Sequence, residues 1–334
     1  MPTWPCGSRR VGGRSRARVR IACAVALLAF ATATPAALAG GVPVQLAAAG
    51  DKIWTCSDAG LVVLDARTGL ILRHPRVGSS YPLQVALAGG AAWVAGVENR
   101  FVAGALSRVE LATGHSSVVL RPRRGPVFAV AASGGRVWAL VGSTSHARIV
   151  QIDAHSGRRI GLVHGASEPA AVAADRSGIW IVDASGWLLH ARQSDRRAGR
   201  VLRVPPGSRG APVVALGLGD AWVSDGNMLV RVDERTNRPL ARISVRGLPL
   251  AMAAGDGAVW ALLLQRSKQH DRMWLARVST MTDTVNANVR VSTSASSLAV
   301  GAGGVWVGVS GFSPRVLRVD ARTRTVRLLA RLGR

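Results

Sequence analysis

The body of the chain alternates short apolar runs with turn residues, and this pattern recurs about every 42 residues. In one such unit, apolar runs at 213–216, 221–224 and 229–233 are separated by turns rich in Gly, Asp and Asn. Alternating apolar and β-branched residues between such turns are typical of strands and hairpins. A fourth run at 239–245 completes the unit, so the pattern predicts four short strands in each repeat.

Tryptophan marks every repeat, and an alanine stands seven positions before each of these tryptophans. The tryptophans are Trp54, Trp93, Trp138, Trp180, Trp222, Trp260 and Trp306. The alanines are Ala47, Ala86, Ala131, Ala173, Ala215, Ala253 and Ala299. Repeats of 40 to 45 residues with four strands each are typical of β-propeller blades. The sequence therefore predicts an all-β fold, a seven-bladed β-propeller of four-stranded antiparallel blades, as a single domain over residues 40–334.

Packing explains these repeated residues. The first strand of a blade lies nearest the axis, where blades crowd together and a small side chain such as Ala fits. Trp on the second strand is large enough to fill the gap between blades. The repeated tryptophans therefore indicate structure rather than a site, whereas Trp187 and Trp274 lie outside the pattern.

Residues 1–39 have the order of a secretory signal peptide. A stretch with six Arg and no acid precedes the apolar run 21–31, and Ala37-Leu38-Ala39 supplies small residues for cleavage. We expect cleavage after Ala39 and a location outside the cell, in the cell envelope or in the periplasm. An uncleaved signal would instead be a membrane anchor. The mature chain keeps Cys56 as its one cysteine, which excludes an intramolecular disulfide.

The charge is strongly positive, with 43 Lys and Arg against 18 Asp and Glu, or +25. Hydrophobic residues make up 48% of the chain, which excludes a disordered protein. Many arginines fall on or beside the predicted fourth strands, where charge protects an exposed sheet edge. The alternative is a basic rim that attracts polyanions. These strands lack the interleaved aromatic residues that stack on bases, which makes nucleic acid the weaker partner hypothesis.

An acidic residue followed by a turn commonly ends the third strand. The acids are Asp65, Glu110, Asp153, Asp233 and Asp320. Such a side chain accepts hydrogen bonds from backbone N–H groups two or three residues later, so we predict a role in the turn rather than in catalysis.

The segments 82–94 (PLQVALAGGAAWV) and 298–307 (LAVGAGGVWV), with 318–323 (RVDART), resemble the YVTN and streptogramin lyase (virginiamycin B lyase) group of β-propellers. The resemblance covers residues 40–334 and implies the propeller fold. In the lyases it implies a metal-assisted elimination by His and Glu residues on one face. The matching slot three residues after Trp holds Asp in two blades, and the sequence has no His-x-His or Glu-x-His pair. Catalysis thus stays an open question, with a non-catalytic role favoured and a divalent cation expected only under the lyase alternative.

Ligands of propellers commonly bind at loops, here those that join strands two and three and those that join successive blades. These loops supply the candidate ligand-binding residues Asp58, Glu98, His146, Asp183, Asp225, His270, Asp271 and Phe312. Asp58, Asp183 and Asp225 could together bind a cation at the channel mouth, or each could satisfy backbone donors in its own turn. We favour the turn. Adjacent residues of a loop point apart, so His270 and Asp271 are interpreted as exposed loop residues rather than as an acid–base pair.

The sequence thus favours an exported, non-catalytic, monomeric propeller that binds a protein, a glycan or an anionic cell-envelope polymer, with no metal or other cofactor. A streptogramin lyase-like carbon–oxygen lyase and a polyanion- or DNA-binding protein with an Arg-rich rim are the alternatives. A membrane partner is expected only if the signal is uncleaved. The four predicted strands of the first blade all come from the start of the propeller region, and those of the last blade all come from its end. No blade is shared between these two ends, so the pattern leaves open how the ring closes.

Overall fold

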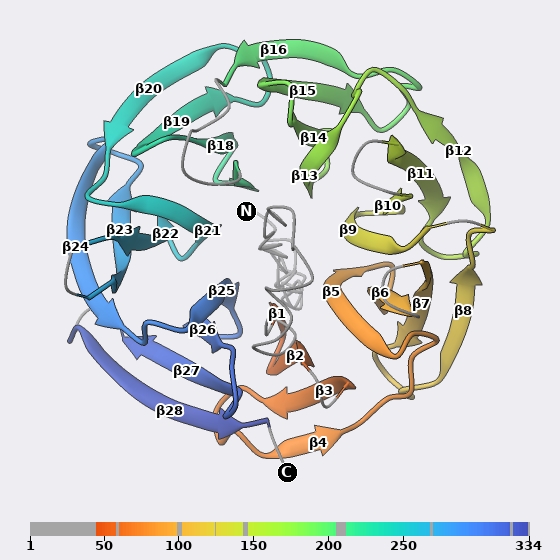
Figure 1. Ribbon diagram of the computed structural model, residues 1–334, viewed down its shortest axis with the longest axis horizontal. Helices are drawn as coiled ribbons and strands as arrows, with labels where there is room; N and C mark the ends of the chain where they lie inside the picture. The colour runs from red at the N-terminus through yellow and green to blue at the C-terminus, as the bar shows by residue number, and fades with distance from the viewer. Residues whose placement is uncertain are drawn as a thin grey trace, which may run out of the picture.

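The computed structural model describes residues 45–57, 60–98, 102–123, 125–142, 146–204, 212–267, 270–320 and 323–332. These residues form seven four-stranded antiparallel sheets, arranged as blades around a central axis (Figure 1). The predicted all-β, seven-bladed propeller is confirmed. Within the described ranges, no helix has the length and apolar character needed to cross a membrane. The expected signal peptide, 1–39, lies outside them.

Each blade is built from four consecutive strands. Blades 1 to 3 contain β1 (Gln45–Ala49), β2 (Lys52–Ser57), β3 (Gly60–Asp65), β4 (Ile71–Arg73); β5 (Tyr81–Ala88), β6 (Ala91–Glu98), β7 (Ala103–Glu110), β8 (Ser116–Leu120); and β9 (Val127–Ser133), β10 (Arg136–Val141), β11 (Arg148–Asp153), β12 (Arg159–Val163). Blades 4 and 5 contain β13 (Pro169–Ala174), β14 (Gly178–Asp183), β15 (Trp187–Arg192), β16 (Gly199–Arg203); and β17 (Val214–Gly217), β18 (Asp220–Asp225), β19 (Met228–Asp233), β20 (Pro239–Ser244). Blades 6 and 7 contain β21 (Leu248–Gly255), β22 (Ala258–Gln265), β23 (Arg272–Ser279), β24 (Thr284–Val291); and β25 (Ala295–Gly301), β26 (Gly304–Val309), β27 (Arg315–Asp320), β28 (Thr325–Arg331). The four strands of blade 5 begin and end within one residue of the apolar runs that predicted them.

The register of every blade places the repeated alanine directly opposite the repeated tryptophan. The pairs are Ala47–Trp54, Ala86–Trp93, Ala131–Trp138, Ala173–Trp180, Ala215–Trp222, Ala253–Trp260 and Ala299–Trp306. All of these side chains are at most 4% exposed. A small residue on the inner strand therefore lies beside a large one on the second strand in each blade, which is the packing that the spacing predicts.

A cationic or aromatic side chain of the third strand covers the indole in several blades. Three of these pairs are Arg231 with Trp222 (5.6 Å from guanidinium carbon to ring centroid), Arg277 with Trp260 (5.9 Å) and Arg318 with Trp306 (5.3 Å). In blade 4 the position belongs to His190, whose ring stacks on Trp180 with centroids 4.3 Å apart. Cation–π contacts of this kind contribute about 0.5–1 kcal/mol each at partly exposed sites.

The ring closes by packing between the first and last blades. All strands of blade 1 lie within 45–73 and all strands of blade 7 within 295–331, so the two ends share no sheet. One buried apolar cluster joins both blades, with Ile53 and Leu64 from blade 1 and Trp306 from blade 7. In the part of the chain that the structure describes, closure therefore depends on side-chain packing and not on strand pairing.

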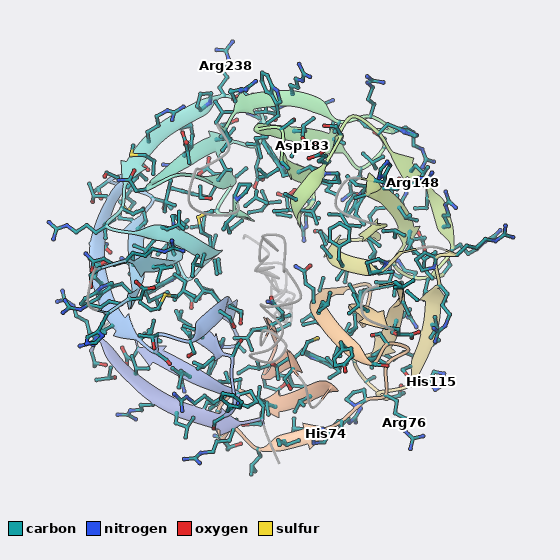
Figure 2. The ribbon with its side chains drawn as sticks, in the orientation of Figure 1. His74, Arg76, His115, Arg148, Asp183 and Arg238 are labelled. Atoms are coloured by element: carbon teal, nitrogen blue, oxygen red, sulfur yellow. The ribbon has the colours of Figure 1, made fainter. Side chains whose placement is uncertain are left out.

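The fourth strands form the outer wall of the ring (Figure 1). Arginines lie on or beside this wall, and Arg76 and Arg238 project outward from it (Figure 2). The basic rim expected from the sequence is thus present on the outside of the molecule.

Candidate functional site

The loops between strands two and three of each blade share one face with the connections between blades, and we call it the ligand face. Two of its predicted acidic residues form ion pairs. Glu98, at the end of β6, accepts a hydrogen bond from Arg121 at 3.0 Å, and this Arg also donates to the Gly78 carbonyl. Asp225, at the end of β18, accepts one from Arg242 at 2.9 Å. Both carboxylates are thus engaged within their own blades.

Asp183 is buried, with 2% of its surface exposed, at the end of β14 inside blade 4 (Figure 2). It accepts hydrogen bonds from the backbone and hydroxyl of Ser185, the hydroxyl of Ser167 and the backbone N–H of Glu168. Burial by itself would raise its pKa, but the hydrogen bonds outweigh that effect and the pKa is lowered. The carboxylate holds the loop before β13 against the β14–β15 turn.

The other predicted polar residues of this face are Asp58, His146, His270 and Asp271. Asp58 lies outside the described residues. His146 is exposed on the connection to β11. His270 and Asp271 are exposed before β23, where the Ser267 hydroxyl and the His270 backbone bond to each other. In the part of the chain that the structure describes, no three His, Cys, Asp or Glu residues are grouped so that they could hold a metal ion.

Phe312 is the predicted residue that belongs to a cavity. The cavity has a volume of about 490 Å³ and lies at the end of blade 7, where β26 leads into β27. We call it the blade-seven pocket, and its lining includes Ser294, Val309, Ser310, Phe312, Ser313 and Arg315. The Phe312 side chain is 103% exposed, the largest relative exposure among the apolar side chains in the described ranges. Such a ring is a flat apolar surface offered to a ligand.

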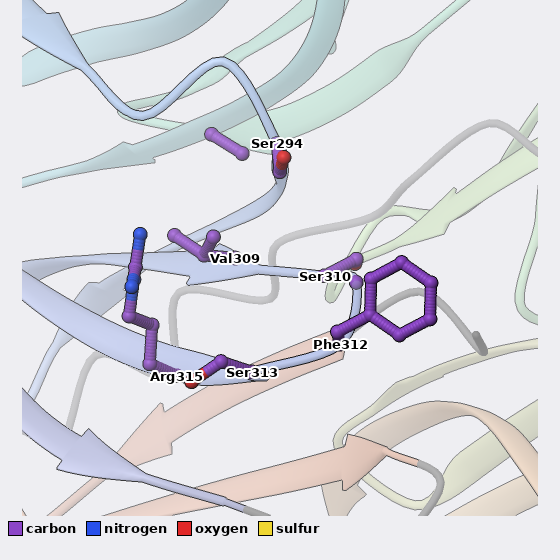
Figure 3. A pocket seen from close by; sticks show the side chains of 8 residues that line it. Ser294, Val309, Ser310, Phe312, Ser313 and Arg315 are labelled. Atoms are coloured by element: carbon purple, nitrogen blue, oxygen red, sulfur yellow. The ribbon is translucent and has the colours of Figure 1, made fainter. Parts of the chain in front are cut away.

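Arg315 supplies the charge of the blade-seven pocket. It is half-buried, and within the described ranges it forms no ion pair or hydrogen bond through its guanidinium. It also lies directly opposite Arg331 on β28, where two like charges repel. Figure 3 shows Phe312 at one end of the group and Arg315 at the other, with Ser294 and Ser310 between them. The pocket thus combines an aromatic face, hydroxyls and an unpaired cation.

The opposite face holds a pair of carboxyl groups that sequence reasoning missed. Glu234 follows β19 in blade 5, and its side chain is hydrogen-bonded to Asp175 in the β13–β14 turn of blade 4. Burial, that hydrogen bond and the nearby charges of Asp175, Asp220 and Asp233 raise the pKa of Glu234 to about 9. Asp175 also accepts hydrogen bonds from the backbone and hydroxyl of Ser177 at 2.8 and 2.6 Å. Glu234 is therefore the proton donor of the pair at neutral pH.

Glu234 differs from the residues at the equivalent position of other repeats, and this difference is visible in the sequence. The residue after the third-strand acid is Ala66 in blade 1, Leu111 in blade 2 and Ala154 in blade 3. Ala154 packs against Gly89 of the preceding blade, so this position lies at the seam between blades. A Glu in the same position places a carboxyl group in an apolar seam, where it finds the Asp175 carboxylate.

His190 lies beside this pair. Its Nδ1 is 2.9 Å from Asn237 Oδ1, and its Nε2 is buried without a hydrogen-bond partner among the described residues. Burial lowers the pKa of His190, and the Asn237 hydrogen bond only partly opposes this effect. The ring is neutral and packed on Trp180. Cys56 is likewise buried, which raises the pKa of its thiol, so it is not an activated nucleophile.

Comparison with known proteins supports the fold and no particular function. No family model and no curated protein matches the chain. A chain of the mitotic checkpoint complex crystal structure aligns with a TM-score of 0.59 and 10% identity, covering 99% of this chain and all of that one. The dihydro-heme d1 dehydrogenase NirN in complex with DHE aligns with a TM-score of 0.51 and 15% identity, covering 80% of this chain and 70% of that one. The computationally designed Ika8 protein aligns with a TM-score of 0.56 and 14% identity, covering 86% of this chain and 96% of that one.

Proposed function

We propose that the protein is an exported, non-catalytic β-propeller that binds an acidic glycan in the blade-seven pocket. The observation that carries the proposal is the half-buried Arg315, which has no ion-pair partner among the described residues and lines the same pocket as the fully exposed Phe312. The flat apolar ring suits the C–H face of a sugar, the serine hydroxyls suit its hydroxyl groups, and a guanidinium binds a carboxylate bidentately.

A binding role is supported further by the acids of the ligand face. Glu98, Asp183 and Asp225 are each held by an arginine or by turn donors, so they are poorly placed to act as bases on a ligand. The blade-seven pocket itself is lined by hydroxyls and a cation, with no carboxyl or imidazole group among the lining residues that the structure describes. Such a lining binds an anion but supplies no general base.

The proposal is tested with a microarray of oligosaccharides in matched acidic and neutral forms. The protein should bind uronic-acid oligosaccharides and bind their neutral counterparts at least about tenfold more weakly. Arg315→Gln should abolish this preference, and Phe312→Ala should weaken binding of both forms. Met281→Ala is the matched control, because Met281 is 94% exposed and lies in the β23–β24 turn, outside the pocket. Equal binding of the acidic and neutral forms, or no binding of either, would contradict the proposal.

Export is tested separately. Mass spectrometry of the protein from the producing cell's envelope or medium should find an N-terminus at Gly40. A cytoplasmic protein that keeps residues 1–39 would contradict export without touching the glycan site.

A further inference from the structure

Trp187 falls outside the seven-fold pattern, and the structure gives it a distinct setting. It opens β15 in blade 4, half-buried, and packs partly against the core. Two guanidinium groups from β16 lie over its ring, with the Arg200 carbon 4.7 Å and the Arg203 carbon 5.3 Å from the centroid. The repeated tryptophans have at most one such partner each among the described residues.

The two arginines are like charges that contact the same indole ring. Neither forms an ion pair in the described part of the chain, and both are exposed on the outer wall. The indole gives both guanidinium groups a cation–π contact. An oxyanion bound at these groups would offset their positive charge and accept charge-assisted hydrogen bonds from them.

The basic surface continues across the seam to blade 3. Arg196 and Arg197 directly precede β16, and this segment bonds to blade 3 through His164, whose N–H donates to the Arg196 carbonyl at 2.8 Å. The Arg196 guanidinium lies against the β12 backbone, because a Cβ at Gly161 would collide with it. Arg159 opens β12 and is exposed. The outer walls of blades 3 and 4 thus carry five arginines, Arg159, Arg196, Arg197, Arg200 and Arg203, which we call the basic track.

None of the five arginines of the basic track forms an ion pair with an acid among the described residues. Asp195, adjacent to Arg196, uses its carboxylate to accept hydrogen bonds from the Arg192 N–H and the Ser194 hydroxyl. Arg196 bonds to the neutral amide oxygen of Gln151 at 3.3 Å. On the neighbouring wall of blade 5, by contrast, Arg242 is paired with Asp225. Arg159, Arg197, Arg200 and Arg203 thus have no acidic ion-pair partner among the described residues, and Arg196 is bonded to a neutral amide.

We propose that the outer wall formed by Trp187, Arg200 and Arg203, continued by Arg159, Arg196 and Arg197, binds the phosphate groups of a linear phosphate polymer. Guanidinium forks match phosphate oxygens, and a row of them suits successive phosphates along a chain. The indole is half-buried and already contacts two guanidinium groups, which leaves little of it for a nucleobase to stack on. This site is separate from the blade-seven pocket and does not depend on the glycan proposal.

The test uses fluorescently labelled inorganic polyphosphate and the purified protein, with binding followed by anisotropy at several salt concentrations. Arg200→Gln/Arg203→Gln should weaken binding at least about tenfold and reduce the slope of log affinity against log salt by about 1.5–2. The matched control, Arg290→Gln/Arg327→Gln, removes two exposed arginines from the fourth strands β24 and β28, which lie in blades 6 and 7. It should change affinity no more than about twofold. Equal losses in both double variants would overturn the site, because diffuse charge would then explain the binding.

A second pair of variants leaves the charge unchanged. Trp187→Leu removes the platform under the two arginines and should weaken polyphosphate binding several-fold, whereas Trp187→Phe keeps an aromatic face and should bind nearly as the wild type. Thermal unfolding confirms that each variant is folded. If Trp187→Leu is unfolded, the site is judged from Trp187→Phe and from the two arginine double variants. Tighter binding of heparin, or equally tight binding of oligo-dT, would overturn the phosphate-polymer assignment in favour of a sulfated glycan or of nucleic acid.

Discussion

At the scale of single residues, Glu234 has the most perturbed carboxyl group that the structure describes on either face. Its pKa of about 9 arises first from burial and then from the Asp175 hydrogen bond and neighbouring acids. In the unfolded chain the ordinary pKa of Glu applies, so between about pH 4.5 and 9 the folded protein holds a proton that the unfolded chain has lost. Stability from this group is therefore complete in acid and falls as the pH rises through that window.

Glu234→Gln should remove this pH dependence, because Gln keeps a donor toward Asp175 and cannot ionise. We expect the variant to be more stable than the wild type at pH 7–8, by about 1–2 kcal/mol once the partial exposure of the side chain is allowed for, and nearly equal at pH 4.5. Urea unfolding at these pH values measures the difference. An unchanged pH slope would show that Glu234 is ionised in the folded protein.

Glu110→Gln is the matched control with the opposite sign. Glu110 occupies the turn position in blade 2, where hydrogen bonds from the Thr113 side chain and then from Arg108 lower its pKa. Its contribution is present above the ordinary pKa of Glu and lost as the pH falls. The variant should therefore be less stable than the wild type at neutral pH.

At the scale of elements, the turn between the third and fourth strands repeats with its hydrogen bonds. Asp65, Asp153 and Asp233 each accept bonds from the backbone N–H groups two and three residues later and from a Thr or Ser hydroxyl. In each case the side-chain and backbone hydrogen bonds lower the pKa of the Asp. The turn role predicted for these acids is confirmed.

Asp233→Ala should destabilise the β19–β20 hairpin, because the donors of Arg235 and Thr236 lose their acceptor. We expect the thermal midpoint to fall by about 2 °C. Asp233→Asn keeps an acceptor oxygen and should lose less, while Asp271→Ala, at an exposed loop residue, should leave the midpoint unchanged. Differential scanning calorimetry at pH 7 compares the three. Equal midpoints for Asp233→Ala and Asp271→Ala would show that the turn does not need the carboxylate.

The repeat also decides which features the sequence can predict. The seven-residue spacing from Ala to Trp predicts strand register, because it reflects packing inside a blade that recurs seven times. Contacts between blades join residues far apart in sequence, so the Glu234–Asp175 pair emerges only in three dimensions. The arrangement of Arg200 and Arg203 over Trp187 lies within blade 4, but it occurs in one blade and so leaves no repeated pattern. Phe312 was identified from loop length, but the unpaired Arg315 beside it was not, since one Arg among 41 carries no signal by itself.

At the scale of the whole molecule, the ring closes at the seam between blades 1 and 7. Gly69, in the β3–β4 turn of blade 1, has a φ of 77° and lies against Leu329 of β28. A Cβ at Gly69 would collide with the backbone carbonyl oxygen of Leu329. On the inner side, a Cβ at Gly301 of β25 would lie 3.0 Å from the Ala48 carbonyl oxygen of β1. Both ends of the seam thus need glycine for close backbone contact.

Gly69→Ala tests whether this packing closes the ring. The substitution adds backbone strain at positive φ, about 1 kcal/mol, and forces β28 away from blade 1, so we expect a total loss of about 2–4 kcal/mol. Gly219→Ala is the matched control, because Gly219 has a φ of 87° with nothing within 4 Å of its Cβ position, and it should lose only the strain. Hydrogen exchange should show faster exchange in β1 and β25–β28 of the Gly69→Ala variant and in no other blade. Since no strand pairing links blades 1 and 7 among the described residues, a variant as stable as the control would mean that the buried cluster of Ile53, Leu64 and Trp306 holds the ring closed by itself.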